Sequence, residues 1–180
     1  MDTQSSARLA YEDSCRLLQS LGYLEEGAIP PIPDHRPRYD DEEPLGVAFF
    51  RTLVAQGDLQ NLTLPRTYFG RSEVGPVSFR NTDLSESNLC WNDFNEVDFS
   101  DCDLSGGDLR ASLFRKVKFV RANLRNADFR RSGFEDCDFT NAEMLGAKIT
   151  GSQGAELRLS DKQRSEIEWQ STEGEAPDGG

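Results

Sequence analysis

The sequence has few of the side chains on which catalysis and metal binding usually depend. Its 180 residues include one histidine, His35, which lies in a proline-rich stretch with no second histidine to act beside it. A histidine-based metal site or a catalytic triad is therefore disfavoured. No glycine-rich phosphate-binding loop is present either, since Gly106 and Gly107 fall inside a regular repeat. We expect no catalytic residue, no cofactor and no metal site, and hence no enzyme.

Paired cysteines and long apolar runs are also lacking. The four cysteines, Cys15, Cys90, Cys102 and Cys137, form neither a CxxC metal-binding pair nor a recognisable disulfide framework. No apolar run approaches the roughly 18 residues of a membrane span. The N-terminus does not have the basic segment followed by an apolar one that marks a secretory signal. These features predict a cytoplasmic protein in a reducing compartment, without a membrane partner.

What the sequence does contain is a five-residue repeat. From Leu59 to Ile149, every fifth residue is Leu, Phe, Val, Met or Ile. The nineteen central residues are Leu59, Leu64, Phe69, Val74, Phe79, Leu84, Leu89, Phe94, Phe99, Leu104, Leu109, Phe114, Phe119, Leu124, Phe129, Phe134, Phe139, Met144 and Ile149. A period of five fits neither the period of about 3.6 of a helix nor the period of about two of a strand. It predicts a chain that turns at fixed intervals and keeps these side chains inside.

The repeat resembles that of the pentapeptide-repeat family, as in Ala-Asn-Leu-Arg-Asn at residues 122–126 and Ala-Asp-Phe-Arg-Arg at residues 127–131. The resemblance implies an all-β repeat solenoid, a right-handed quadrilateral β-helix with four five-residue faces in each coil. The sequence supports four faces independently, because central residues twenty positions apart are alike. One column reads Leu59, Phe79, Phe99, Phe119 and Phe139, and the next reads Leu64, Leu84, Leu104, Leu124 and Met144. We expect about five coils, stacked about 4.8 Å apart.

Distinct segments flank the repeats. We predict an N-terminal helical segment at 1–27, a proline-rich acidic linker at 28–44, an N-terminal cap at 45–56, the β-helix at 57–159, a C-terminal capping helix at 160–170 and a disordered tail at 171–180. Caps are needed because each end of a β-helix is an open sheet edge that exposes the central hydrophobic residues of its last coil, which we call rungs. Ser160 and Gln163 are spaced as a capping box, which indicates where the C-terminal helix begins, and we expect that helix to include Ile167 and Trp169.

The net charge of −12 suits a protein that mimics DNA, and some pentapeptide-repeat proteins protect DNA gyrase from inhibitors by imitating duplex DNA. A duplex mimic should carry its negative charge along the β-helix itself. Residues 57–152, however, contain fifteen acidic and twelve basic residues, a net charge of only −3. Aspartates recur just before the central residue of many repeats, where we expect a solvated surface rather than a metal site. The charge distribution therefore places the DNA mimic second among the functional hypotheses.

Charges within the repeats are ordered along the chain. Residues 81–108 contain eight acids and no base, whereas residues 109–131 contain eight bases and one acid, Asp128. Because stacked coils bring such bands together, they predict either ordinary ion pairs between coils or a dipolar docking surface for a partner.

One stripe of this surface combines an aromatic residue with arginines. On one face, the two residues that follow each central residue are expected to project outward. They provide the Trp91 stripe, which consists of Arg71, Trp91, Arg110, Arg130 and Arg131. Exposed Trp and Arg are the residue types that most often dominate protein interfaces. Two arrangements remain open: Trp91 is exposed to a partner, or the N-terminal linker lies over the stripe and buries it.

Two functional hypotheses follow. The first is a non-catalytic protein-binding scaffold that acts through the outer faces of a rigid β-helix, such as an inhibitor or an immunity-type antagonist of a bacterial toxin. The second is a DNA mimic that protects DNA gyrase, as in quinolone resistance, or binds another nucleic-acid enzyme. In both cases the partner is another protein. Direct nucleic-acid binding is disfavoured, because one basic band on an acidic protein is a weak footprint. The oligomeric state is left open.

Overall fold

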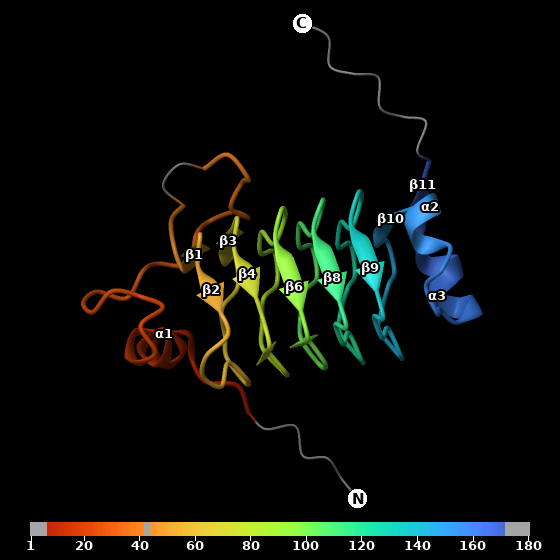
Figure 1. Cartoon of the computed structure of the whole chain (residues 1–180). Helices are drawn as coiled ribbons and strands as arrows, with labels where there is room; N and C mark the ends of the chain where they lie inside the picture. The colour runs from red at the N-terminus through yellow and green to blue at the C-terminus, as the bar shows by residue number, and fades with distance from the viewer. Residues whose placement is uncertain (1–6, 42–43, 172–180) are drawn as a thin grey trace, which may run out of the picture.

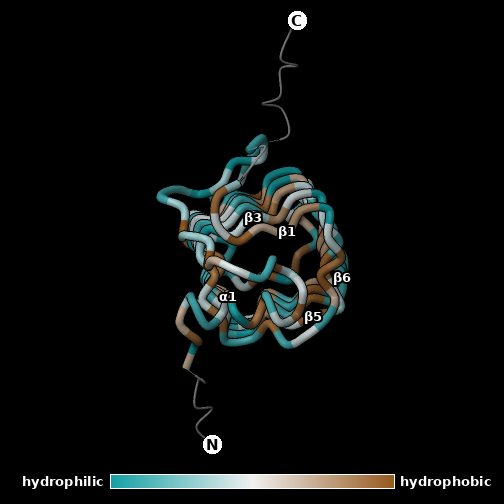
Figure 2. Tube along the Cα trace, turned by 90° about the vertical axis from the view of Figure 1, so that its left-hand side faces the viewer, coloured by the Kyte–Doolittle hydropathy of each residue, from teal (hydrophilic) through white to brown (hydrophobic). Residues whose placement is uncertain are grey.

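The computed structural model describes residues 7–41 and 44–171, which wind into a four-sided β-helix with helices at both ends (Figure 1). The helices are α1 (Tyr11–Ser20), α2 (Gly151–Gly154) and α3 (Asp161–Glu166). The strands are β1 (Ala48–Phe50), β2 (Leu53–Val54), β3 (Tyr68–Gly70), β4 (Glu73–Val74), β5 (Val77–Ser78), β6 (Asp93–Asn95), β7 (Val97–Asp98), β8 (Leu113–Arg115), β9 (Gly133–Glu135), β10 (Lys148–Thr150) and β11 (Glu168–Gln170). Viewed along its axis, the molecule shows successive coils superposed around a common interior (Figure 2). The predicted β-solenoid is confirmed.

The strands pair in parallel, and partners are twenty residues apart. The longest ladder passes residues 48, 68, 88, 108, 128, 148 and 168. A second ladder consists of β2, β4, β6, β8 and β9. The other two pass residues 63 to 143 and residues 78 to 138 in the same register. The four columns of like residues in the sequence therefore correspond to four sides.

The central residues of the repeats fill the interior. Eighteen of the nineteen are buried, and Phe134 is half-buried. Rings of one column stack face to face: Phe94 and Phe114 have centroids 5.0 Å apart and planes 6° apart. Rings of neighbouring columns meet edge to face, as Phe114 and Phe119 do at 5.6 Å. Phe134 is more exposed because, within the described residues, no further strand pairs with β9.

The structure has about six coils rather than the five expected, because the longest ladder extends further at both ends. Its seven positions are separated by six steps of twenty residues. At the N-terminus, β1 and β2 pair with β3 and β4, so the segment 45–56 contributes strands to the first coil. Phe49 and Val54 in fact continue the five-residue period backward from Leu59. At the C-terminus, β11 pairs with β10 after the chain has passed through α2 and α3.

Helix α1 covers the N-terminal end of the β-helix (Figure 1). Its Cys15 and Leu18 side chains are fully buried in the same core as the rungs. Just after the helix, the ring of Tyr23 meets that of Phe49 edge to face at 5.5 Å. The cap that we expected from residues 45–56 is thus supplied by α1, whose apolar side closes the interior above the first coil.

The C-terminal end is covered by α2 and α3. Ser160 and Gln163 form the predicted capping box, in which Ser160 Oγ accepts from the Gln163 backbone at 3.2 Å and Gln163 Oε1 accepts from the Ser160 backbone at 3.0 Å. The Gln163 amide also donates to the carbonyl oxygens of Phe139 and Ala142, at 2.7 and 3.0 Å. The buried Gln163 side chain therefore caps the start of the helix and supplies hydrogen-bond donors to two carbonyl oxygens at the open edge of the last coil. Trp169, expected in this helix, lies instead in β11.

The recurring aspartates close the corners of the coil. Seven of them accept a hydrogen bond from the backbone N–H two residues further along, which is an Asx turn. The aspartates that do so are Asp58, Asp83, Asp98, Asp103, Asp108, Asp128 and Asp138. The next residue along each corner has a left-handed backbone, with φ of 59° at Asn61 and 60° at Asp101. Turn geometry thus explains these seven acidic positions of the repeat.

Candidate functional site

The proline-rich linker lies along one side of the β-helix. The guanidinium of Arg66 donates to the carbonyl oxygen of Pro33 at 2.7 Å. The guanidinium of Arg36 donates to the carbonyl oxygen of Gly106 at 2.8 Å. Because residues 66 and 106 occupy equivalent places two coils apart, the linker follows the axis rather than a single coil.

Trp91 lies beside this linker and is still exposed. Its ring centroid is 6.1 Å from that of Tyr39, with the planes 40° apart, and 54% of Trp91 is exposed. The neighbouring Cys90 is buried, and this burial raises the pKa of its thiol to about 12. Cys90 therefore does not project outward as the repeat pattern predicted. The linker lies beside Trp91 without burying it.

Arg110 and Arg130 are held by aspartates of their own repeats. Arg110 Nε and Nη2 donate to the two carboxylate oxygens of Asp108 at 2.8 and 2.7 Å. Arg130 Nε and Nη2 donate in the same way to the two carboxylate oxygens of Asp128, at 2.9 and 2.7 Å. Such forks fix the plane of each guanidinium. Within the described residues, no hydrogen bond involves Nη1 of either arginine.

The forks also shift the protonation equilibria of the groups in them. The hydrogen bond to Asp108 raises the pKa of the Arg110 guanidinium above its usual range. Burial alone would raise the pKa of Asp128, but the hydrogen bonds and charge of Arg130, with the charge of Arg110, bring it below its ordinary value. The forks therefore keep both arginines charged and oriented.

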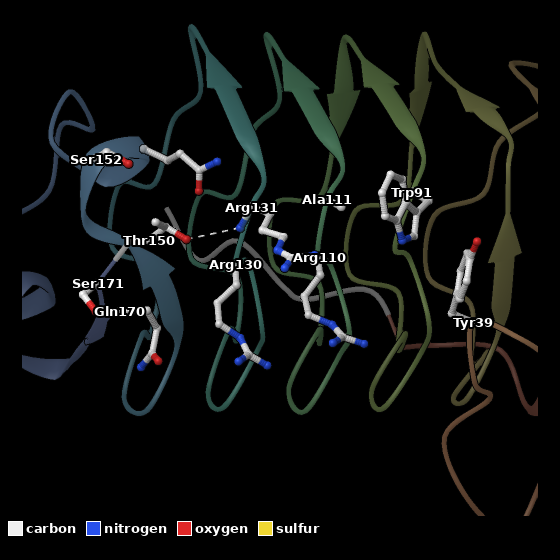
Figure 3. A pocket seen from close by; sticks show the side chains of 11 residues that line it. Tyr39, Trp91, Arg110, Ala111, Arg130, Arg131, Thr150, Ser152, Gln170 and Ser171 are labelled. Carbon is white, nitrogen blue, oxygen red and sulfur yellow. Dashed lines mark hydrogen bonds between the residues drawn. The ribbon is translucent and has the colours of Figure 1, made fainter. Parts of the chain in front are cut away.

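Four residues of the Trp91 stripe, Trp91, Arg110, Arg130 and Arg131, line one groove (Figure 3). Its volume is about 600 Å³, and its other lining residues are Tyr39, Ala111, Thr150, Ser152, Gln153, Gln170 and Ser171. We call it the Trp91 groove. Its described lining contains three arginines and no carboxylate. Figure 3 shows the two fork-held arginines in a row, between the aromatic pair at one end and Gln170 with Ser171 at the other. The fifth residue of the stripe, Arg71, is exposed but does not line the groove.

Much of the remaining basic band is paired between coils. Arg121 Nε lies 2.6 Å from a carboxylate oxygen of Asp101, and Lys116 Nζ lies 3.3 Å from one of Glu96. In each pair the partners are twenty residues apart, one coil from the other. The hydrogen bond from Arg121 also lowers the pKa of Asp101. For these residues, the charge bands correspond to ordinary ion pairs between coils.

The inward polar side chains support the backbone. Ser112 Oγ donates to the carbonyl oxygen of Leu89 at 2.8 Å and accepts from the backbone of Asn92 at 3.1 Å. Asn92 Oδ1 accepts from the backbone of Ser72 at 2.7 Å, one coil earlier.

The exposed His35 lies in the linker. Within residues 7–41 and 44–171, no three His, Cys, Asp or Glu side chains gather as they would to hold a metal. Nor does this part of the chain contain a helix long and apolar enough to cross a membrane.

Three parts of the groove escaped the sequence analysis. Tyr39 lines the groove because the linker runs past it. Gln170 and Ser171 line it because β11 pairs with β10 at the end of the longest ladder. None of these positions belongs to the five-residue repeat. Thr150 had a usable signal, since it follows Ile149 as Arg130 follows the central residue of an earlier repeat. Its hydroxyl accepts a hydrogen bond from the backbone of Arg131 at 3.2 Å.

Comparison with known proteins agrees with the predicted resemblance. The family profile described as "Pentapeptide repeat region" matches residues 72–149. A search of curated protein sequences gives no significant match.

Solved structures with a similar fold include HetL, a pentapeptide repeat protein involved in heterocyst differentiation regulation from the cyanobacterium Nostoc sp. strain PCC 7120. The match has 21% identity and a TM-score of 0.54, and covers 56% of this chain and 48% of HetL. QnrB1, a plasmid-mediated fluoroquinolone resistance protein, matches at 12% identity with a TM-score of 0.52, covering 57% of this chain and 55% of QnrB1. The alignments thus span about half of each of these proteins. At such identities, the similarity establishes the fold alone.

Proposed function

The repeat region of this chain belongs to the pentapeptide-repeat family, and from this premise we propose that the protein is a non-catalytic protein-binding scaffold whose contact surface is the Trp91 groove. The observation that carries the proposal is the exposed Trp91 in one groove with the fork-held Arg110 and Arg130. Tryptophan and arginine contribute most often to the binding energy of protein interfaces.

The rigidity of the support strengthens this proposal. The backbone on both sides of Trp91 is fixed by parallel pairing to the coils before and after it. The forks restrict the two arginine side chains before any partner arrives, so less conformational entropy is lost on binding. A surface of this kind selects a partner by shape and by hydrogen-bond geometry.

The chemistry of the groove indicates what the partner offers. Three arginines line the groove, and the donors of Arg110 and Arg130 that their forks with Asp108 and Asp128 leave over favour an acidic segment. The Trp91 ring favours an apolar or aromatic side chain next to it. An inhibitor or immunity-type antagonist of a bacterial toxin is the role that we propose for such a scaffold. The four free cysteines support action in a reducing cytoplasm.

The alternative is a DNA mimic that protects gyrase. It is supported by the acidic run at residues 81–108. Part of that charge is neutralised at the surface, because Asp101 pairs with both Arg80 and Arg121. A gyrase supercoiling assay with a fluoroquinolone separates the two functions: protection at stoichiometric protein concentration would favour the mimic, and no protection would favour the scaffold.

A site-specific crosslinking experiment tests the scaffold function. A photo-crosslinking amino acid replaces Ala111, inside the groove, or Val120, which is not among its lining residues. We expect one partner to crosslink at position 111 and not at position 120. That crosslink should be lost in Trp91→Ala and Arg130→Glu and kept in Lys118→Glu, which makes the same type of charge change outside the groove. Equal crosslinking at the two positions, or persistence in the groove variants, would contradict the proposal.

A further inference from the structure

The chain itself passes the end of the Trp91 groove. Strand β11 returns to the longest ladder, next to β10, and this places Gln170 and Ser171 at the rim of the groove (Figure 3). Ser171 is the last residue that the structure describes. The sequence that continues from it therefore starts at the groove.

The continuing sequence has the charge that the groove attracts. Residues 172–180 contain three acidic residues, Glu173, Glu175 and Asp178, and no basic residue. The described lining of the groove contains three arginines and no carboxylate, although Arg110 and Arg130 are also paired with Asp108 and Asp128 of their own repeats. Opposite charges a few ångströms apart in a partly enclosed groove attract more strongly than on an open surface.

The length of this segment is sufficient for it to follow the groove. Residues 171, 151, 131, 111 and 91 occupy equivalent places on successive coils, so Ser171 and Trp91 are separated by four coil steps. At about 4.8 Å per step the separation is about 19 Å. Nine residues in an extended conformation span about 30 Å. The segment can therefore pass all three arginines and reach Trp91.

The groove also contains a hydrogen-bond acceptor that lacks a donor. The Oε1 atom of Gln153, which lines the groove, is buried and has no hydrogen-bond partner among the described residues. An unsatisfied buried acceptor costs free energy, and native proteins rarely retain one. An extended peptide carries a backbone N–H at nearly every residue and can supply the missing donor.

We propose that residues 172–180 occupy the Trp91 groove in cis, with their carboxylates against its arginines. The segment is tethered at Ser171, so even a weak contact is favoured by an effective concentration of about a millimolar. Its regulatory consequence rests on the proposed function: the segment competes with the partner, and the partner must present a similar acidic stretch to displace it. The docking in cis does not itself depend on that function.

Quenching of Trp91 fluorescence by acrylamide tests the docking on the full-length chain. The chain has two tryptophans, so Trp169→Phe leaves Trp91 as the only emitter. In this background, the triple variant Glu173→Gln, Glu175→Gln, Asp178→Asn should raise the quenching constant about twofold, because it releases a segment held at millimolar effective concentration. About 0.5 M sodium chloride shortens the Debye length to a few ångströms. It should raise the quenching constant similarly in the chain with the unmodified segment and leave that of the triple variant unchanged.

A double-mutant comparison assigns the effect to the groove. Arg130→Gln should raise the quenching constant as the neutral segment does, and combining the two changes should add little further. Lys118→Gln, outside the groove, should leave it unchanged. Equal quenching in all variants would overturn the proposal. A quenching difference that grows with protein concentration would also overturn it, because the occupant would then be a second copy.

The two proposals can fail separately. If no partner crosslinks at position 111 but quenching still differs between the charged and the neutral segment, the scaffold function is refuted and the docking in cis stands. A partner that crosslinks equally with the charged and the neutral segment, without a quenching difference, would refute the docking alone.

Discussion

The ring of Phe119 stacks on the ring of Phe139, with centroids 4.8 Å apart and planes 18° apart. On its other side Phe119 stacks on Phe99 at 5.6 Å. The three residues are separated by steps of twenty, and parallel pairing in register places equivalent side chains one above another. The interior of the β-helix is therefore a set of continuous columns, and its stability depends on every rung.

Phe119→Ala should lower the free energy of unfolding by about 3–5 kcal/mol, since it leaves a cavity in the middle of an aromatic column. Chemical denaturation followed by far-UV circular dichroism measures the change. Phe50→Ala, at a residue that is 51% exposed, is the matched control and should cost less than about 1 kcal/mol. Similar losses in the two variants would contradict the role of the column.

Asn92→Ala should destabilise the protein by about 2 kcal/mol or more, because it leaves several buried backbone groups without partners. The Asn92 amide donates to the carbonyl oxygens of Phe69 and Cys90, each at 2.8 Å, and its oxygen accepts from Ser72. The measurement is the denaturation midpoint at constant slope. The control is the exposed Asn95, whose replacement by Ala should have little effect. A neutral Asn92→Ala would show that this polar column is dispensable.

Asp128→Asn should destabilise the protein at neutral pH by about 1–2 kcal/mol, through loss of the charged fork with Arg130. The pKa of Asp128 is lowered in the folded state, so its contribution is present above the unfolded pKa of about 3.9 and is lost as the pH falls through the folded value. The difference between Asp128→Asn and the unmodified protein should therefore shrink below about pH 4.

Denaturation at a series of pH values from neutral to acidic measures this dependence. The control is Asp136→Asn, at an exposed residue of a neighbouring repeat, for which we expect a small difference at every pH. A difference between Asp128→Asn and the unmodified protein that stays constant down to the lowest pH would show that the fork does not stabilise the ionised form.

Leu18→Ala should destabilise the N-terminal coil by about 2–5 kcal/mol, because Leu18 is fully buried between α1 and the first rungs. Hydrogen exchange should show the largest loss of protection in β1 and β3, with a smaller loss toward the C-terminus, as expected when repeats contact only their neighbours. Leu9→Ala, at a residue that is 41% exposed, is the control. Uniform loss of protection along the whole chain would contradict capping by α1.

The identity of the rungs and the number of sides could be predicted from the sequence. A residue such as Phe119 is buried because of its place in a five-residue period, and that place is visible without knowledge of any distant contact. The stacking of Phe99 on Phe119 follows in the same way from the twenty-residue recurrence. Even the first coil was accessible, since Phe49 and Val54 keep the period. The outward orientation of Trp91 and the alignment of Arg110 with Arg130 follow from the same repetition, but whether the linker buries Trp91 was left open by the sequence.

The groove itself required the tertiary structure. Tyr39 lies beside Trp91 because of the path of a linker that has no period, and the burial of Cys90 departs from the outward orientation that the repeat predicted. Gln170 and Ser171 reach the groove because β11 rejoins the ladder after two helices that interrupt the pattern. A repeated local pattern determines which side of the chain is buried, since equivalent residues of every coil pack against the same kind of neighbours. The course of the non-repeating segments depends on contacts between residues far apart in sequence, and only the folded chain brings these together.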